Sequence, residues 1–173
     1  MKKTFAMMLC ILVPMAAAFA APDATVTFYS TGSLFHAALK AGATLGYPGK
    51  APFTGFVFDG DRRLGLMQPG RFMTLHLPPG PHTFAPATMR STKRHSEKTQ
   101  LPVTLEPGKQ YFVRLNQTIR GFYVVQIPIQ HFEQVDCETA REEASGTEPI
   151  KAKRVEKDVR GSLENVAYFP SCK

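Results

Sequence analysis

The sequence lacks the motifs by which common enzyme classes and membrane proteins are recognised. It has no Gly-x-Ser-x-Gly nucleophile turn, no His-Glu-x-x-His zinc motif and no glycine-rich loop of the type that holds phosphates. Tryptophan is absent. Beyond residue 20, no apolar run approaches the roughly 20 residues that a membrane-spanning helix needs. We therefore expect no catalytic residues, no cofactor and no transmembrane segment after that point.

Cysteine is scarce, and the first of the three cysteines lies in a segment predicted to be removed. Two lysines begin that segment, an apolar run follows, and Ala18-Phe19-Ala20 supplies the small-x-small end of a secretory signal peptide. Residues 1–20 are therefore predicted to be cleaved, which makes the protein periplasmic or secreted. Lipidation at Cys10 is not expected, because Met7-Met8-Leu9 stand where small residues normally precede a lipidated cysteine.

The remaining cysteines, Cys137 and Cys172, form an even pair without Cys-x-x-Cys spacing. In an oxidising compartment this pair predicts one disulfide. The bridge would close a loop of about 36 residues and stabilise the fold by roughly 3–4 kcal/mol in the loop-entropy model. Two separate buried thiols are the alternative.

Acidic residues are fewer than basic ones, with 14 Asp and Glu against 21 Lys and Arg and a formal charge of +7. Loss of the two lysines of the signal leaves 19 basic residues and a charge of +5. This moderate excess favours contact with an anionic envelope surface. It falls short of the profile of nucleic-acid-binding proteins, so nucleic acid is not an expected partner.

Turn dipeptides recur every ten residues, at Asp59-Gly60, Pro69-Gly70 and Pro79-Gly80. Such pairs supply the backbone angles of tight turns, and the segments between them alternate apolar with polar residues as strands do. The pattern gives eight strand candidates: 25–29, 56–58, 64–67, 72–77, 82–85, 101–105, 111–115 and 121–129. We expect residues 21–135 to form an antiparallel β-sandwich of about seven or eight strands, with the turns as its corners.

Two of these candidates carry a more specific expectation. Residues 121–129 form the most apolar stretch after the signal, so we expect a central strand there. In residues 72–77, Met73, Leu75 and Leu77 alternate with more polar positions, so one face of this strand should point to the core.

Two segments favour short helices. Residues 33–41 begin with Ser33 as a helix N-cap, and residues 136–144 are charged and end before Gly146. Residues 136–173 are thus expected to form a short helix and a basic tail, which the disulfide pins to the β domain.

Several short motifs, in this order along the chain, resemble a known family. They are Thr31-Gly32-Ser33, Val57-Phe58-Asp59-Gly60, Leu77 to His82, Leu105 to Tyr111 and Val135 to Glu142. The order resembles a family of small exported bacterial proteins catalogued only as a domain of unknown function. That family is similar to PEGA-type and carboxypeptidase-regulatory-like (transthyretin-like) modules, which implies a β-sandwich over residues 24–150. The chain departs from the family by continuing to Cys172 and by lacking a lipoprotein signal.

A basic surface is the strongest candidate for a binding site. The candidates share a positive charge on a loop or hairpin tip, and they are Arg90, Lys93, Arg94, Arg62 and Arg63. Positive loops contact lipopolysaccharide phosphates, anionic lipid headgroups or acidic proteins. A solvated loop without a ligand is the alternative.

Histidines and aspartates near the turns offer weaker candidates for a metal site. His76 and His82 flank one turn and, with an acid such as Asp59, could hold zinc; polar residues facing solvent are the alternative. Asp59 and Asp61 could bind a cation, but Asp-Gly is also what a type I′ turn requires, and calcium needs several more oxygens. We interpret these residues as turn residues, and no metal is predicted.

The function expected from these observations is non-enzymatic. We predict a binding or structural module of the cell envelope that contacts a protein or an anionic surface polymer. A small-molecule or glycan carrier with exposed aromatic residues is one alternative, although alternation places most strand aromatics in the core. A metal-dependent hydrolase using His76, His82 and Asp59 is the other.

Overall fold

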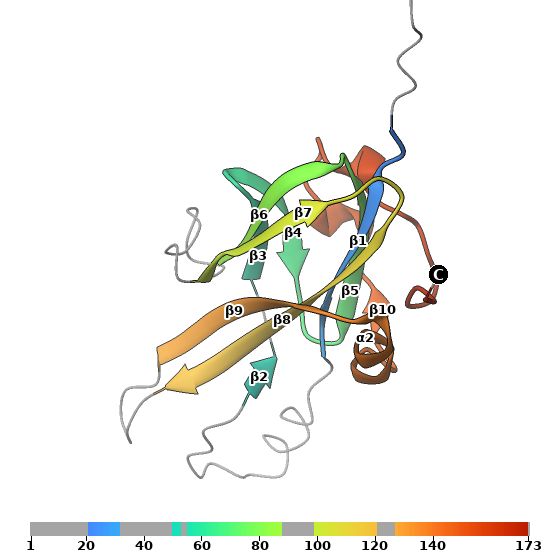
Figure 1. Ribbon diagram of the computed structural model, residues 1–173. Helices are drawn as coiled ribbons and strands as arrows, with labels where there is room; N and C mark the ends of the chain where they lie inside the picture. The colour runs from blue at the N-terminus through green and yellow to red at the C-terminus, as the bar shows by residue number, and fades with distance from the viewer. Residues whose placement is uncertain (1–20, 32–49, 53–54, 88–98, 121–126, 173) are drawn as a thin grey trace, which may run out of the picture.

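Two β-sheets make up most of the described chain (Figure 1). The computed structural model describes residues 21–31, 50–52, 55–87, 99–120 and 127–172. Its strands are β1 (Ala24–Ser30), β2 (Lys50–Pro52), β3 (Gly55–Asp59), β4 (Arg62–Met67), β5 (Arg71–Leu77), β6 (Gly80–Ala87), β7 (Leu101–Leu105), β8 (Gln110–Arg120), β9 (Ile127–Val135) and β10 (Glu148–Pro149). The prediction of a mainly β protein is confirmed.

The strand order shows one wholly antiparallel sheet and one mixed sheet. The smaller sheet has the order β4-β3-β6-β7, and every neighbouring pair in it is antiparallel. The larger sheet has the order β10-β5-β1-β8-β2, with β9 paired to the other edge of β8. In this sheet β1 pairs with β8, and β10 with β5, in parallel. The expectation of a wholly antiparallel fold was therefore wrong, because long connections leave strand direction free where no tight hairpin fixes it.

The strand expected over residues 121–129 is placed differently. Residues 121–126 lie outside the described residues, and β9 begins at Ile127 and continues to Val135. It pairs with β8 alone, so it lies at the edge of the larger sheet and is not central. In Figure 1, β8 and β9 run side by side beyond the part of β8 that pairs with β1. The helix expected over residues 33–41 lies outside the described residues.

The three repeated turn dipeptides form corners between successive strands. Gly60 lies between β3 and β4, Gly70 between β4 and β5, and Gly80 at the start of β6; all three have positive φ angles. At Gly60 the φ angle is 56°, a left-handed conformation that glycine adopts without the steric cost of a side chain. The interpretation of these dipeptides as strand corners is confirmed.

One main core joins the two sheets. Its buried side chains come from both of them, for example Phe28 and Val113 from the larger sheet and Phe84 and Val57 from the smaller. The rings of Phe28 and Phe84 meet edge to face, with centroids 4.9 Å apart. Aromatic pairs of this geometry add about 0.5–1.5 kcal/mol beyond the burial of their area.

A second, smaller core covers the opposite face of the larger sheet. Tyr29 and Phe72 alternate with Phe28 and Met73 along their strands, so they point away from the main core. The only α-helix among the described residues, α2 (Cys137–Glu143), packs against them. Residues Phe72 to Leu75 of β5 are all buried, so the expectation that only one face of this strand points to a core was incomplete.

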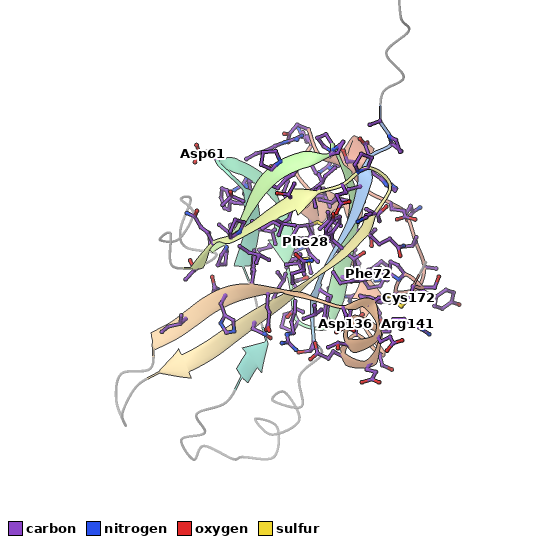
Figure 2. The ribbon with its side chains drawn as sticks, viewed as in Figure 1. Phe28, Asp61, Phe72, Asp136, Arg141 and Cys172 are labelled. Atoms are coloured by element: carbon purple, nitrogen blue, oxygen red, sulfur yellow. A yellow bond between two sulfur atoms is a disulfide. The ribbon has the colours of Figure 1, made fainter. Side chains whose placement is uncertain are left out.

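The α2 helix confirms the helix expected after residue 135. Asp136 is its N-cap, because a carboxylate oxygen accepts a hydrogen bond from the backbone N–H of Thr139 at 2.8 Å. That hydrogen bond lowers the pKa of Asp136. Ala140 is fully buried and turns the small side of the helix toward the sheet. Figure 2 shows Cys172 next to this helix, near Asp136 and Arg141.

A partly buried ionic group attaches α2 to the sheet. The phenol of Tyr29 donates to Glu143 Oε2 at 2.6 Å, and Arg114 bonds both Glu143 and Glu133. Burial, followed by the hydrogen bond to Glu143, raises the pKa of Tyr29 well above its usual value. Burial lowers the pKa of Arg114, but the hydrogen bond and charge of Glu133 and the charge of Glu143 outweigh it, so that pKa rises.

Residues 148–172, the C-terminal segment, close one side of the molecule. β10 pairs with the outer edge of β5, and Leu163 forms a further bridge to Leu75 of the same strand. Val155 bridges Gly65 on the outer edge of β4, in the other sheet. The segment therefore covers an exposed edge of each sheet, where unpaired backbone groups would otherwise invite association with other chains.

Side chains and one covalent bond fix the C-terminal segment in place. Val155 and Val159 are buried in the main core. Phe169 packs edge to face on Tyr29 and Phe72, with centroids 5.5 and 5.4 Å away. The predicted disulfide between Cys137 and Cys172 is confirmed, with Cα atoms 5.7 Å apart. The segment is thus anchored by packing along its length as well as by the disulfide.

Candidate functional site

The structure places two of the five predicted binding residues, and it gives both a partner in the C-terminal segment. Arg62 donates from Nε to Asp158 at 2.8 Å, and Arg63 Nε lies 2.6 Å from Glu156 Oε1. The hydrogen bond from Arg62 lowers the pKa of Asp158. The guanidinium of Arg63 also covers the ring of Phe56, at 4.7 Å from the centroid.

These contacts give the two arginines a structural role. Their charges are balanced by acidic side chains, and they tie the C-terminal segment to the start of β4. The other three candidates, Arg90, Lys93 and Arg94, lie outside the described residues. Their role in binding stays a prediction.

Of the three residues considered for a zinc site, Asp59 and His82 contact each other. His82 Nδ1 lies 2.6 Å from Asp59 Oδ2, and His82 Nε2 lies 2.9 Å from the carbonyl oxygen of Pro78. Each ring nitrogen therefore lies within hydrogen-bond distance of an oxygen atom. The nitrogen that a general base or a metal ligand would use is therefore engaged with backbone.

The second histidine has different surroundings. His76 Nδ1 lies 3.4 Å from Thr25 Oγ1, and its Nε2 lies 3.7 Å from Glu164. Across the described parts of the chain, no three His, Cys, Asp or Glu side chains gather closely enough to hold a metal ion. Asp61 lies at the tip of the β3–β4 hairpin, far from α2 (Figure 2).

The strand aromatics are mainly core residues, as the alternation predicted. Phe58, Phe72, Phe84 and Phe112 are all buried. Among the described residues, Tyr168 is the one large apolar side chain that is strongly exposed, at 85%. Phe53, Phe122 and Tyr123 lie outside the described residues.

A small hollow lies where β4 and β5 meet the C-terminal segment. Its volume is about 150 Å³, and it is lined by Leu66, Gln68, Arg71, Ile150, Lys151, Lys153 and Arg154. The pairing of β10 with β5 brings residues 150–154 to this position. The short 3-10 helix η2 (Ala152–Arg154) then turns the chain toward the Val155 bridge on β4.

The lining of this hollow, called the cationic hollow below, is strongly positive. Four of its residues carry a positive charge and none carries a negative one. Arg71 bonds Glu148, which stands beside the hollow. Lys151, Lys153 and Arg154 have no acidic partner among the described residues, in contrast to Arg62 and Arg63. Mutual repulsion of these cations is reduced when an anion binds between them.

Gly65 allows the C-terminal segment to lie close to β4 and line one side of the cationic hollow. A side-chain carbon on Gly65 would lie 3.1 Å from the backbone oxygen of Arg154 and 3.4 Å from Val155 Cα. Contacts that short would push the segment away from β4. Glycine at this position therefore lets Arg154 approach the sheet closely.

The sequence predicts a basic tail within residues 136–173 but no binding site in it. Lys151, Lys153 and Arg154 appear in the sequence among alternating charges, which is typical of a solvated tail. Their convergence with Arg71 depends on the β10–β5 pairing, which joins residues far apart in the chain. Pro149 before a cluster of three cations was the one local sign, and it does not identify the partner strand.

Comparisons with protein-family models, curated proteins and solved structures find no match to this chain. Of the helices in the described part, none has both the length and the apolar character needed to cross a membrane. The geometry of the cationic hollow is therefore the main basis for assigning a function.

Proposed function

We propose that the protein is a non-enzymatic binding module of the cell envelope, which contacts an anionic surface polymer through its C-terminal segment. The observation that carries this proposal is the set of unbalanced cations, Lys151, Lys153 and Arg154, around one hollow. Arg62 and Arg63, by contrast, are each paired with an acidic side chain. An unbalanced cluster attracts anions and loses that attraction as salt screens it.

The proposed location and fold agree with this function. We propose that residues 1–20 are a cleaved signal peptide and that the protein is periplasmic or secreted. The Cys137–Cys172 disulfide supports this location, because such bonds persist in oxidising compartments. We also propose that the two sheets form a β-sandwich similar to the PEGA-type and transthyretin-like modules. Their shared core supports the sandwich, and the parallel β1–β8 pair is a distinctive feature of it.

Binding to anionic polymer at two salt concentrations tests the proposal. Purified protein would be titrated with polygalacturonate and with vesicles of anionic or zwitterionic lipid, at 0.15 M and 1 M salt. The Debye length falls from about 8 Å to about 3 Å between these conditions, so cation-driven binding should weaken strongly. Replacing Lys151, Lys153 and Arg154 together with Gln should have the same effect at low salt.

A second triple variant separates the two basic regions. Replacing Arg90, Lys93 and Arg94 with Gln removes the same charge from the loop predicted by the sequence. If only this variant weakens binding, the contact surface is that loop and the proposal for the C-terminal segment is wrong. If the wild-type protein binds no anionic surface at low salt, the proposed function itself is wrong.

A further inference from the structure

We propose that the cationic hollow binds a phosphoryl group, as found in phosphate monoesters, with Arg71, Lys153 and Arg154 as its main ligands. This inference rests on the proposed function, which it narrows from anions in general to one anion chemistry. It assigns the C-terminal segment a specific site. Nothing in the sequence motifs indicates it, because Arg71 is far in the chain from Lys151, Lys153 and Arg154.

The size of the hollow fits a compact group. Its volume of about 150 Å³ is about ten times the 10–15 Å³ that a single bound water requires. Pockets for whole drug-sized ligands are larger, about 300–1,000 Å³. A single tetrahedral anion is therefore a better match than an extended molecule enclosed on all sides.

The charge of the hollow matches a multivalent anion. Lys151, Lys153 and Arg154 have no acidic partner in the described chain, and only one acid, Glu148, balances Arg71. A phosphate monoester carries about −1.5 to −2 charges at pH 7, whereas a carboxylate carries one. The excess of cations thus favours the phosphoryl group over a lone carboxylate.

The hydrogen-bond donors of the cationic hollow also suit a phosphoryl group. Arginine presents a planar fork of N–H groups that suits phosphate oxygens, and lysine adds a mobile point charge. The NH1 group of Arg71 bonds Glu148 and approaches the carbonyl oxygen of Pro149 at 3.5 Å. Its remaining N–H groups have no partner among the described residues and can bond a ligand. Leu66 and Ile150 supply apolar lining, which lowers the local dielectric and strengthens charge-assisted hydrogen bonds.

A neighbouring hollow leaves room for the group that carries the phosphate. It has a volume of about 270 Å³, lies between β5 and the C-terminal segment, and shares Ile150 with the cationic hollow. Arg160, Glu164 and Asn165 contribute hydrogen-bonding groups to its lining. Such groups suit hydroxyls, so a phosphorylated sugar would place its anion in one hollow and its ring toward the other.

Calorimetric titration of the purified protein tests the inference. The probes are inorganic phosphate, glucose 6-phosphate, acetate and vesicles containing phosphatidic acid, each at constant ionic strength. We expect phosphate to bind at least ten times more tightly than acetate. The double variant Lys153→Gln/Arg154→Gln should weaken phosphate binding at least tenfold.

The double variant Arg141→Gln/Lys157→Gln is the matched control, because it also removes two cations and neither residue lines the cationic hollow. It should change the affinity less than twofold. Equal losses in the control and in Lys153→Gln/Arg154→Gln would overturn the inference, because the effect would then be general charge. Unchanged melting temperatures would show that both variants remain folded.

The probes also identify the source of the phosphoryl group and separate the two proposals. Binding of glucose 6-phosphate tighter than that of phosphate supports a soluble ester, and binding of phosphatidic acid vesicles alone supports a lipid headgroup. If no phosphate-bearing probe binds, the inference is wrong. Salt-sensitive binding of polygalacturonate in the same series would then leave the proposed function standing, and its absence would remove both.

Discussion

The hydroxyl of Tyr29 offers a direct test of how α2 is attached to the sheet. Tyr29 is fully buried, and its hydroxyl donates to the carboxylate of Glu143 at 2.6 Å. Hydrogen bonds to charged groups contribute about 1.5–3 kcal/mol. Tyr29→Phe should therefore lower the free energy of unfolding by about 2 kcal/mol. For a domain of this size, that corresponds to a fall in melting temperature of about 4–8 °C.

The pH dependence of the same variant gives a second, independent measure. Because folding raises the pKa of Tyr29, its contribution is fully present below the ordinary value of 10.0 and is lost as the pH rises above it. The slope of that loss is at most about 1.4 kcal/mol per pH unit. Tyr29→Phe lacks this group, so its stability should fall less than that of the wild type between pH 10 and 11.

Tyr111→Phe is the control for this experiment. The hydroxyl of Tyr111 accepts from the backbone N–H of Glu106 and donates to the carbonyl oxygen of Thr104, both of them neutral groups near the surface. Its loss should cost about 1 kcal/mol or less. Urea unfolding of the three proteins measures the difference. If Tyr29→Phe lowers the free energy of unfolding by less than about 0.5 kcal/mol, or by no more than the control does, the hydrogen bond between Tyr29 and Glu143 does not hold α2 to the sheet.

Three further outcomes are expected. Replacing Cys137 and Cys172 with Ser should destabilise the protein by up to about 3–4 kcal/mol. Hydrogen exchange should then rise near the C-terminus. An equal rise at Val155 would contradict the finding that packing also anchors the C-terminal segment. His82→Ala removes the side-chain contact of Asp59 and leaves it only the hydrogen bond from the backbone N–H of Thr83, which should cost about 2 kcal/mol. An unchanged urea midpoint would refute that pairing. The pKa of Asp158 is lowered, so its ionised carboxylate stabilises the contact with Arg62 above pH 3.8, and this contribution is lost as the pH falls further. In Asp158→Asn, hydrogen exchange around residue 158 should depend less on pH in that range.

Local patterns predicted much of the fold. The strands from β3 to β8 follow the alternation of apolar and polar residues, and their corners coincide with glycines in positive φ conformations. The α2 helix was expected from the charged, helix-favouring residues 136–144 and from Gly146 after them, and the structure adds Asp136 as its N-cap. Each of these signals lies within a few residues of the structure that it specifies, which is why a single sequence reveals it.

Non-local features were out of reach for the same reason. The parallel pairing of β1 with β8 and the cover that the C-terminal segment gives to β4 and β5 depend on contacts between distant residues. The burial of both faces of β5 follows from that cover and from Phe169, a residue far along the chain. Periodicity within β5 cannot report a layer that a remote segment supplies.

The candidate site shows the same limit. Arg62 and Arg63 read as free cations beside a turn, yet their acidic partners are Asp158 and Glu156, about ninety residues away in sequence. Lys153 and Arg154 read as part of a solvated tail, yet they face Arg71 across a hollow. Charge balance is a property of the folded surface, so composition can predict the charge of a partner but not the position of a binding site.

Residue-resolved NMR on labelled protein, titrated with inorganic phosphate, tests the central claim most directly. The account predicts saturable shift changes at Arg71, at the backbone of residues 150–154 and at the side chains of Lys153 and Arg154. Changes centred on residues 90–98 would contradict it by placing the anion site on the other basic region. An absence of saturable changes in residues 150–154 at millimolar phosphate would contradict it as well.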